Sequence, residues 1–225
     1  MIRGAIFDID GTILDSSRVW DEAPSRFLRE YGMTPPADLI SCLLPLTLQE
    51  GAAYLKERFS LPPEAAEIEE DILGIVRRIY LQEVPAKVWV RPCLQLLQDA
   101  GLPIVLATGG NLTASHMALT RLGLDRYPMA CLSCDRMHTS KREPAIFLEA
   151  AHLIGAEPAQ ILVFEDNLTA LQTAAAAGFR TVGVFDFSNR DHREALISSA
   201  SMTVDGDRPS PDFTEKVRNL LCIPH

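Results

Sequence analysis

The sequence of 225 residues lacks the features of membrane and secreted proteins. None of its apolar runs approaches the roughly 18 residues that a membrane span needs, so we expect no membrane partner. Its five cysteines are odd in number and scattered, which favours reduced thiols over a disulfide framework. Arg3 and Asp8 interrupt the first apolar residues, which is not typical of a signal peptide. The sequence therefore predicts a cytoplasmic location.

Positive charge is also scarce. The chain has 21 Lys and Arg residues against 30 Asp and Glu residues, which gives a net charge of -9. Such a field opposes binding to nucleic acid, so we expect no nucleic-acid partner. A ligand that carries phosphate would have to be held by local cations.

Several familiar motifs are missing. GxSxG, Walker-type and GxGxxG sequences do not occur, which removes the common hydrolase, nucleotide triphosphatase and dinucleotide-binding classes. Cys131 and Cys134, with His138 nearby, have partial metal spacing. A closed zinc site needs four ligands and no second cysteine pair follows, so the sequence disfavours zinc.

Apolar strands and amphipathic helices alternate over most of the chain. This alternation predicts an α/β fold, a doubly wound parallel sheet with a Rossmann-like core. Strands are expected near residues 2–7, 103–107, 129–133, 161–164, 181–185 and 202–204, with helices over 94–100, 112–122, 144–154 and 168–177.

The segment between residues 16 and 88 has a different pattern, because its apolar residues recur at helix spacing throughout. Thr47 and Glu50 form the signature of a capping box, and Pro62 and Pro63 separate two of its helices. We therefore predict two domains. Residues 1–15 and 89–225 form the α/β core, and residues 16–88 form an inserted helical bundle.

Polar side chains follow the expected strands at their carboxyl ends. Asp8 and Asp10 follow the first strand and project to the same side, because side chains alternate along an extended chain. Thr108 follows the second strand, and Glu165 and Asp166 follow the strand at 161–164. Open α/β sheets bind ligands at this edge, so the sequence predicts a site there.

The acids of this site suit phosphoryl transfer. An aspartate such as Asp8 can attack phosphorus and form an aspartyl-phosphate. Asp8 and Asp166 offer the oxygen ligands that Mg²⁺ prefers. Asp10 can protonate the leaving oxygen and later deprotonate water.

Other groups of the site suit the phosphate itself. Thr108, Gly109 and Gly110 stand at a strand-to-helix turn, where backbone N–H groups face an anion. Lys141, in the loop before a helix, would supply a point charge for the phosphate and the crowded carboxylates.

Four motifs follow one another along the chain: Asp8-Ile9-Asp10-Gly11-Thr12, Ala107-Thr108-Gly109, Ser140-Lys141-Arg142-Glu143-Pro144 and Val163-Phe164-Glu165-Asp166-Asn167. In this order they resemble the haloacid dehalogenase superfamily, and the likeness covers essentially the whole chain. It implies an aspartyl-phosphate chemistry with Mg²⁺ and a small helical cap domain at the insertion. The roles it implies are nucleophile for Asp8, general acid/base and carbonyl metal ligand for Asp10, phosphate binding for Thr108 and Lys141, metal ligand for Asp166, and assistance to the metal for Glu165.

Asp10, the second acid of the first motif, distinguishes between branches of this superfamily. True dehalogenases lack it, so Asp10 favours a phosphatase. The related β-phosphoglucomutase carries a histidine near the position of Trp20 and a cationic cap loop, whereas residues 43–48 contain no cation. These differences disfavour a phosphosugar mutase, which stays open as an alternative, as does an inactive protein that binds a phosphorylated ligand. A signalling receiver is excluded, because its phosphorylated Asp lies on a middle strand, where Thr108 stands here.

The sequence thus predicts a Mg²⁺-dependent phosphatase that acts on a small phosphomonoester metabolite. Trp20 follows the catalytic loop closely and is a candidate substrate contact, although helix spacing also suits a place in the cap core. Asn111 is a second candidate contact, in the loop after Thr108. We expect a monomer.

Overall fold

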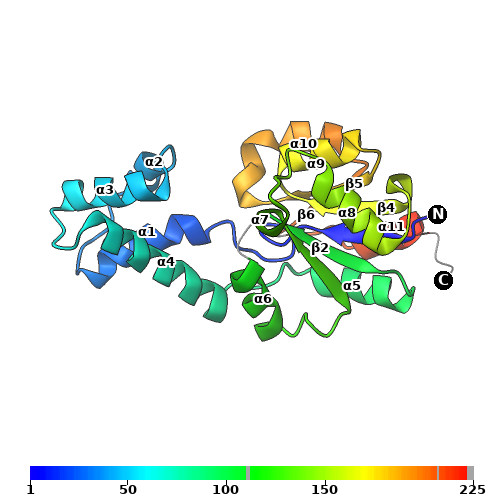
Figure 1. The fold of residues 1–225 in the computed structure, drawn as a ribbon, viewed down its shortest axis with the longest axis horizontal. Helices are drawn as coiled ribbons and strands as arrows, with labels where there is room; N and C mark the ends of the chain where they lie inside the picture. The colour runs from blue at the N-terminus through cyan, green and yellow to red at the C-terminus, as the bar shows by residue number, and fades with distance from the viewer. Residues whose placement is uncertain (110–111, 207, 222–225) are drawn as a thin grey trace. The chain divides into compact units, whose positions relative to one another are not determined.

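The computed structural model describes residues 1–109, 112–206 and 208–221. The chain forms two compact units (Figure 1). The core unit comprises residues Met1–Ser17 and Val84–His225, and the helical unit comprises Arg18–Glu83.

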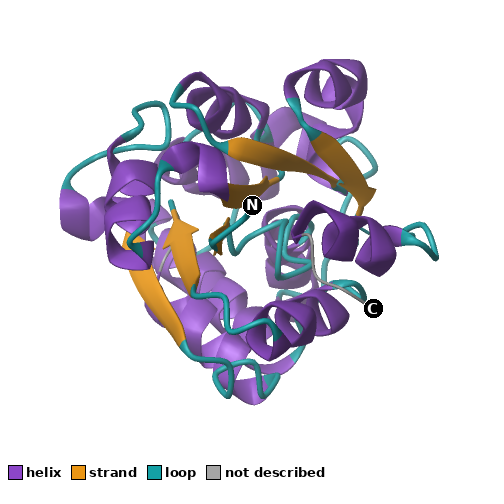
Figure 2. Cartoon of the chain, turned by 90° about the vertical axis from the view of Figure 1, so that its right-hand side faces the viewer, coloured by secondary structure: helices purple, strands orange, loops and turns teal. Residues whose placement is uncertain are grey.

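The core unit contains a parallel sheet with the strand order β3-β2-β1-β4-β5-β6. This arrangement confirms the predicted doubly wound α/β fold, and Figure 2 shows the strands among the surrounding helices. The described strands are β1 (Gly4–Phe7), β2 (Ile104–Thr108), β3 (Met129–Ser133), β4 (Ile161–Glu165), β5 (Arg180–Phe185) and β6 (Met202–Asp205).

Helices cover both faces of the sheet because successive side chains of a buried strand point to opposite faces. Ile6 of β1 and Val163 of β4 belong to a buried cluster with side chains of α8 (Ala145–Ile154) and α9 (Leu168–Ala176). Phe7 stacks on Phe164 with ring centroids 4.2 Å apart, and Trp89 stacks on Phe164 at 5.7 Å. Both faces are therefore buried, and polar side chains gather at the carboxyl ends of the strands.

The remaining helices of the core unit differ in part from expectation. The helix expected over 94–100 begins four residues earlier, at Val90, because Pro92 lies in its first turn, where a proline needs no N–H donor. Three short or C-terminal helices were not predicted: α7 (Cys134–Met137), α10 (Arg193–Ser199) and α11 (Phe213–Leu221). The others are α5 (Val90–Asp99), α6 (Leu112–Arg121) and the 3₁₀ helices η1 (Pro158–Gln160) and η2 (Phe187–His192).

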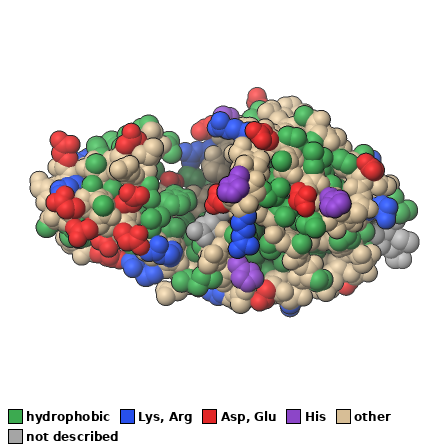
Figure 3. Space-filling model, viewed as in Figure 1, with side chains coloured by type: hydrophobic (Ala, Val, Ile, Leu, Met, Phe, Trp, Pro, Cys, Tyr) green, Lys and Arg blue, Asp and Glu red, His purple; other side chains and the backbone are tan. Residues whose placement is uncertain are grey.

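The helical unit contains α1 (Val19–Glu30), α2 (Leu39–Leu43), α3 (Leu48–Phe59) and α4 (Ala65–Gln82). Helix α4 packs on α1 and α3 through an apolar stripe that includes Ile68, Ile72 and Ile75. The predicted capping box opens α3, where Thr47 and Glu50 exchange hydrogen bonds. Acidic side chains are spread over the face of this unit seen in Figure 3. Among the described residues, no helix has both the length and the hydrophobicity needed to cross a bilayer.

Candidate active site

Four predicted site residues meet at one edge of the sheet. Asp8 follows β1, Thr108 ends β2, Glu165 ends β4 and Asp166 comes next. Because β1 pairs with both β2 and β4, these strand ends are neighbours. Carboxylate oxygens of Asp8, Glu165 and Asp166 lie within 4.8 Å of one another. The strand-end pattern of the sequence therefore located a real cluster of acids.

The turn after Asp8 is shaped by a glycine. Gly11 has a φ of +80°, a conformation that residues with a Cβ rarely adopt, and a Cβ there would overlap the carboxylate of Asp166. Thr12 donates from its hydroxyl to Oδ1 of Asp166 at 3.3 Å. The Ser16 hydroxyl donates to Oδ1 of Asp10 at 2.8 Å. One short segment, residues 11–16, therefore positions both acids through hydrogen bonds to their side chains.

Lys141 reaches the acids from the loop between α7 and α8. Its ammonium forms an ion pair with Asp8 and lies 2.8 Å from Oε2 of Glu165. The other oxygen of Glu165 accepts a hydrogen bond from the backbone N–H of Asn167 at 3.1 Å. Both oxygens of Glu165 are thus engaged, which leaves Asp8 and Asp166 as the carboxylates best able to bind a ligand.

Burial dominates the electrostatics of this cluster. Burial raises the pKa of Asp8 to about 8, with Lys141 opposing the rise and the neighbouring charges of Glu165 and Asp10 adding to it. Burial and the charge of Asp8 likewise hold the pKa of Asp166 well above its usual range. Burial lowers the pKa of Lys141, but Asp8 and Glu165 outweigh that effect and raise it.

The cluster therefore has more acids than cations. Three carboxylates face one ammonium among the described residues, and oxygen ligands of this kind suit a hard divalent cation. A cation held there would favour the ionised carboxylates and lower their pKa values. The donor set fits Mg²⁺.

The predicted phosphate-binding residues lie beside these acids. Thr108 is buried at the end of β2, and Gly109 follows it at the surface. Asn111, predicted as a substrate contact, lies outside the described residues.

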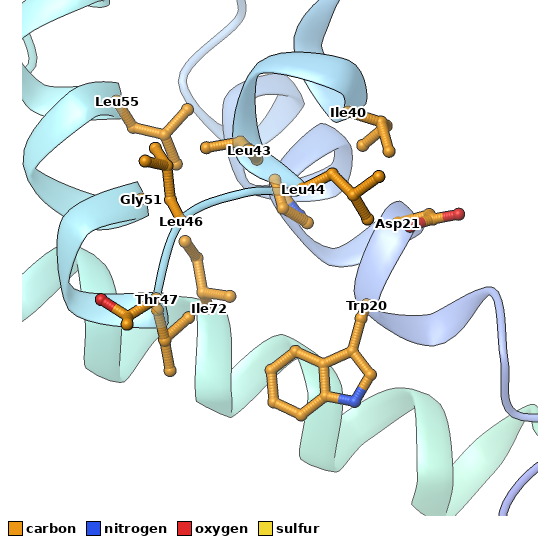
Figure 4. Close-up of a pocket in the computed structure, with 12 residues that line it drawn as sticks. Trp20, Asp21, Ile40, Leu43, Leu44, Leu46, Thr47, Gly51, Leu55 and Ile72 are labelled. Atoms are coloured by element: carbon orange, nitrogen blue, oxygen red, sulfur yellow. The ribbon is translucent and has the colours of Figure 1, made fainter. Parts of the chain in front are cut away.

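Trp20 lies in the helical unit, near the start of α1, and 51% of it is exposed. It is not a buried residue of the cap core, which was the other interpretation of its spacing. It instead lines a cavity of about 310 Å³ within the helical unit, together with Leu43, Leu44 and Leu46 (Figure 4). The remaining lining residues are Asp21, Pro24, Ile40, Thr47, Leu48, Gly51, Leu55 and Ile72.

The sequence did not predict three polar residues that connect to the acid cluster through hydrogen bonds and an ion pair. Asp186 follows β5, so the strand-end rule that located Asp8 would also have located it. Asn189 lies in η2 and donates to the backbone carbonyl of Asp166 at 2.8 Å. Lys87 is buried beside Asp186. No local pattern marks Lys87, because its partners Asp15 and Asp186 are distant in sequence. Asn189 forms a local capping box with Asp186, but its contact with Asp166 spans 23 residues.

Comparison with known proteins agrees with this geometry. Residues 2–178 match the family model described as haloacid dehalogenase-like hydrolase. The chain is 23% identical over 199 residues to a phosphorylated carbohydrates phosphatase of Thermotoga maritima, covering 88% of this chain and 92% of that protein. It is 30% identical over 185 residues to the fructose-1-phosphate phosphatase YqaB of Escherichia coli K12, covering 80% and 95%.

A solved structure shares the fold. It is a Thermotoga maritima chain assigned as a beta-phosphoglucomutase, with a TM-score of 0.85 and 22% identity, covering 98% of this chain and 100% of that one. At that identity the likeness concerns the fold alone. The family match over most of the chain and the ordered acids of the sheet edge lead to one conclusion: this chain belongs to the haloacid dehalogenase-like hydrolase family.

Proposed function

We propose that this protein is a Mg²⁺-dependent phosphatase that hydrolyses a small phosphomonoester through an aspartyl-phosphate on Asp8. The convergence of Asp8, Glu165, Asp166 and Lys141 at the carboxyl edge of the sheet carries this proposal. The curated relatives support it, because phosphorylated carbohydrates and fructose-1-phosphate are the substrates in their names.

The proposed reaction has two steps on one carboxylate. Asp8 attacks phosphorus, an O–P bond forms, and the bond between phosphorus and the leaving oxygen breaks while Asp10 supplies a proton to that oxygen. Asp10 then takes a proton from a water molecule that attacks phosphorus, which frees Asp8 and releases inorganic phosphate. The hydrogen bond from Ser16 fixes the Asp10 carboxylate for both proton transfers.

Metal binding in this proposal rests on Asp8 and Asp166 through their carboxylates and on Asp10 through its backbone carbonyl. When bound, Mg²⁺ would neutralise the crowded acids and stabilise charge on the phosphoryl oxygens. Glu165 assists indirectly, because its two oxygens hold Lys141 and the N–H of Asn167.

Phosphate binding in this proposal uses Lys141, Thr108 and the N–H of Gly109. Lys141 already lies against Asp8, so a phosphoryl group attached to Asp8 would meet its ammonium. This placement lets one lysine balance charge before and after the transfer.

Substrate choice in this proposal depends on the helical unit, acting as the cap domain. The half-exposed indole of Trp20 and the apolar cavity beside it support a contact with the uncharged part of the substrate. The cytoplasmic location and the monomeric state stay predictions.

Phosphate release tests the proposal. The assay would use a panel of sugar phosphates, nucleotides and a chromogenic phosphoester, with Mg²⁺ or EDTA, for wild type and Asp8→Asn. We expect Mg²⁺-dependent release that the variant loses. Isomerisation of a sugar phosphate without release of phosphate would instead establish the mutase. Absence of any turnover across the panel would contradict the general phosphatase and favour a binding protein.

A further inference from the structure

Two segments connect the helical unit to the core unit, residues 12–17 and 84–88, and they pair with each other inside the core unit. Leu14 and Ala86 form an antiparallel bridge. The N–H of Asp15 donates to the carbonyl of Pro85 at 2.9 Å, and the N–H of Lys87 donates to the carbonyl of Ile13 at 2.9 Å. The two linker segments are therefore hydrogen-bonded to each other and form a single paired element.

A buried lysine ties this element to the sheet. The side chain of Lys87 is 1% exposed, and its Nζ lies 2.7 Å from Oδ2 of Asp186 and 3.1 Å from Oδ1 of Asp15. Asp186 is also buried, whereas the side chain of Asp15 is 41% exposed. Burial lowers the pKa of Lys87, but the two aspartates outweigh it and raise that pKa, so the lysine is charged at neutral pH.

From Asp186 the contacts continue to the metal-binding acids. The N–H of Asp186 donates to Oδ1 of Asn189 at 3.1 Å. The side-chain amide of Asn189 donates at 2.8 Å to the carbonyl of Asp166 and, also at 2.8 Å, to the carbonyl of Val184. Asn189 therefore fixes the backbone of Asp166 against the end of β5.

We propose that Lys87, Asp186 and Asn189 form a positioning network that sets the place of Asp166 relative to the paired linkers and thereby determines the affinity of the site for a divalent cation. None of the three is a candidate ligand in the acid cluster. They act indirectly, by orienting a metal ligand. Removing residues that orient metal ligands commonly changes metal affinity about 10–100-fold. This inference rests on the proposed metal site at Asp8 and Asp166.

The competing explanation is that these residues only stabilise the fold. Removing a partner of a buried ion pair is costly in any location, so loss of stability alone cannot separate the two explanations. Metal affinity can separate them. So can hydrogen exchange at residues 11–17, because the network contacts that segment at two points. Asn189 bonds to Asp166, which accepts a hydrogen bond from Thr12, and Asp186 pairs with Lys87, whose Nζ lies 3.1 Å from Oδ1 of Asp15.

The test compares Asn189→Ala with Thr181→Val. Thr181 is a buried residue at the opposite end of β5 whose hydroxyl bonds to the backbone of residues 199 and 201. Calorimetric titration with Mg²⁺ should give a dissociation constant about tenfold higher for Asn189→Ala and unchanged for Thr181→Val. Amide exchange at residues 11–17 should accelerate in Asn189→Ala alone.

A further variant keeps the test informative if Asn189→Ala unfolds, and a second tests additivity if it folds. Asp15→Asn removes the half-exposed partner of Lys87 and leaves Asp186, so it should fold and raise the dissociation constant two- to threefold. Lys87→Met should raise it further, and its effect should not add to that of Asn189→Ala, because both act through one network.

Unchanged Mg²⁺ affinity and unchanged exchange at residues 11–17 in the folded variants would overturn the network. A wild type that binds no Mg²⁺ would instead refute the proposed metal site. In that case accelerated exchange at residues 11–17 in Asn189→Ala would still support the coupling of Asn189 to that segment, and unchanged exchange would overturn it.

Discussion

The core unit and the helical unit present opposite chemistry to a ligand. The core unit gathers three carboxylates and an ammonium at the end of its sheet. The helical unit surrounds its cavity mainly with apolar side chains, and among the described residues that line it Asp21 alone is charged. Under the proposed function, this difference means that the reacting group and the remainder of the substrate are recognised by separate means. Substitutions in the core unit should therefore lower kcat, and those in the helical unit should change KM.

The largest expected effect comes from Asp8→Asn. The amide cannot act as the nucleophile, so we expect phosphate release to fall by at least about 10³-fold. Lys141 keeps its ion pair with Glu165, so the variant should fold. Steady-state assays with the best substrate measure the loss, and Asp191→Asn, a change on an exposed side chain, is the control. Activity within tenfold of wild type would contradict the assignment of the nucleophile.

Lys141→Met should produce the next largest effect. It removes the cation that balances Asp8 and Glu165, and we expect kcat to fall by about 10²–10³-fold. The matched control is Lys216→Met, which breaks an exposed ion pair with Asp212. Such surface pairs contribute at most about 1 kcal/mol, so the control should behave like wild type. Equal losses in both variants would show that the effect is not specific to the site.

Gly11→Ala should lower activity about tenfold or more, because the added Cβ would displace the carboxylate of Asp166. Gly101 has a similar φ of +67° but has open space around the Cβ position, so Gly101→Ala shares the backbone strain and lacks the overlap. We expect a stability loss of about 1 kcal/mol from backbone strain in both variants. Gly11→Ala alone should show a further loss from the overlap and a loss of Mg²⁺ affinity. Calorimetry and thermal unfolding measure the two quantities. Equal Mg²⁺ affinity in the two variants would argue against control of Asp166 by this turn.

Trp20→Ala tests the helical unit. Loss of the indole should raise KM about five- to tenfold for the best substrate, through lost apolar contact, and leave kcat nearly unchanged. Leu81→Ala, on a partly exposed residue outside the cavity, serves as the control. A fall in kcat with KM unchanged would contradict the division of roles between the units.

The smallest expected effect is a change of thermal stability with pH. Burial raises the pKa of Asp8 in the folded protein to about 8 from an ordinary value of 3.8, so its ionisation opposes folding. In EDTA the protein should lose stability as pH rises from about 4 to about 8, and the loss should level off above that range. Asp8→Asn should lose less stability than wild type. The Tm of the variant relative to that of wild type should therefore rise by a few degrees between about pH 4 and about pH 8. Thermal scans in EDTA measure the gain, and a constant Tm difference would contradict the raised pKa.

The sequence predicted the sheet and most of the site because both depend on local signals. Buried parallel strands appear as short apolar runs between helix-capping residues, and their carboxyl ends meet at one edge. Asp8, Thr108, Glu165 and Asp166 were located by that rule alone. Asp186 obeys the same rule at the end of β5 and was overlooked.

Other features had no local signal. Lys87 lies in a linker without periodicity, and its partner Asp15 is 72 residues away. The engagement of both oxygens of Glu165 depends on Lys141 and Asn167 in three dimensions. Helix α10 has seven residues, too few for a clear period. Contacts between distant residues, rather than patterns within segments, account for what the sequence did not predict.

The most direct test of the account is to trap phosphate on Asp8. Wild type would be mixed with a substrate carrying labelled phosphate and Mg²⁺ and quenched in acid within one turnover. One portion would be counted for label on the protein, and a second would be reduced with borohydride, which expels the phosphate and converts an aspartyl-phosphate to homoserine, and then mapped by mass spectrometry. The account predicts label on the unreduced wild-type protein, homoserine at position 8 after reduction, and neither in Asp8→Asn. Rapid Mg²⁺-dependent phosphate release with no label on the protein at any quench time would contradict it, because water would then attack the substrate directly.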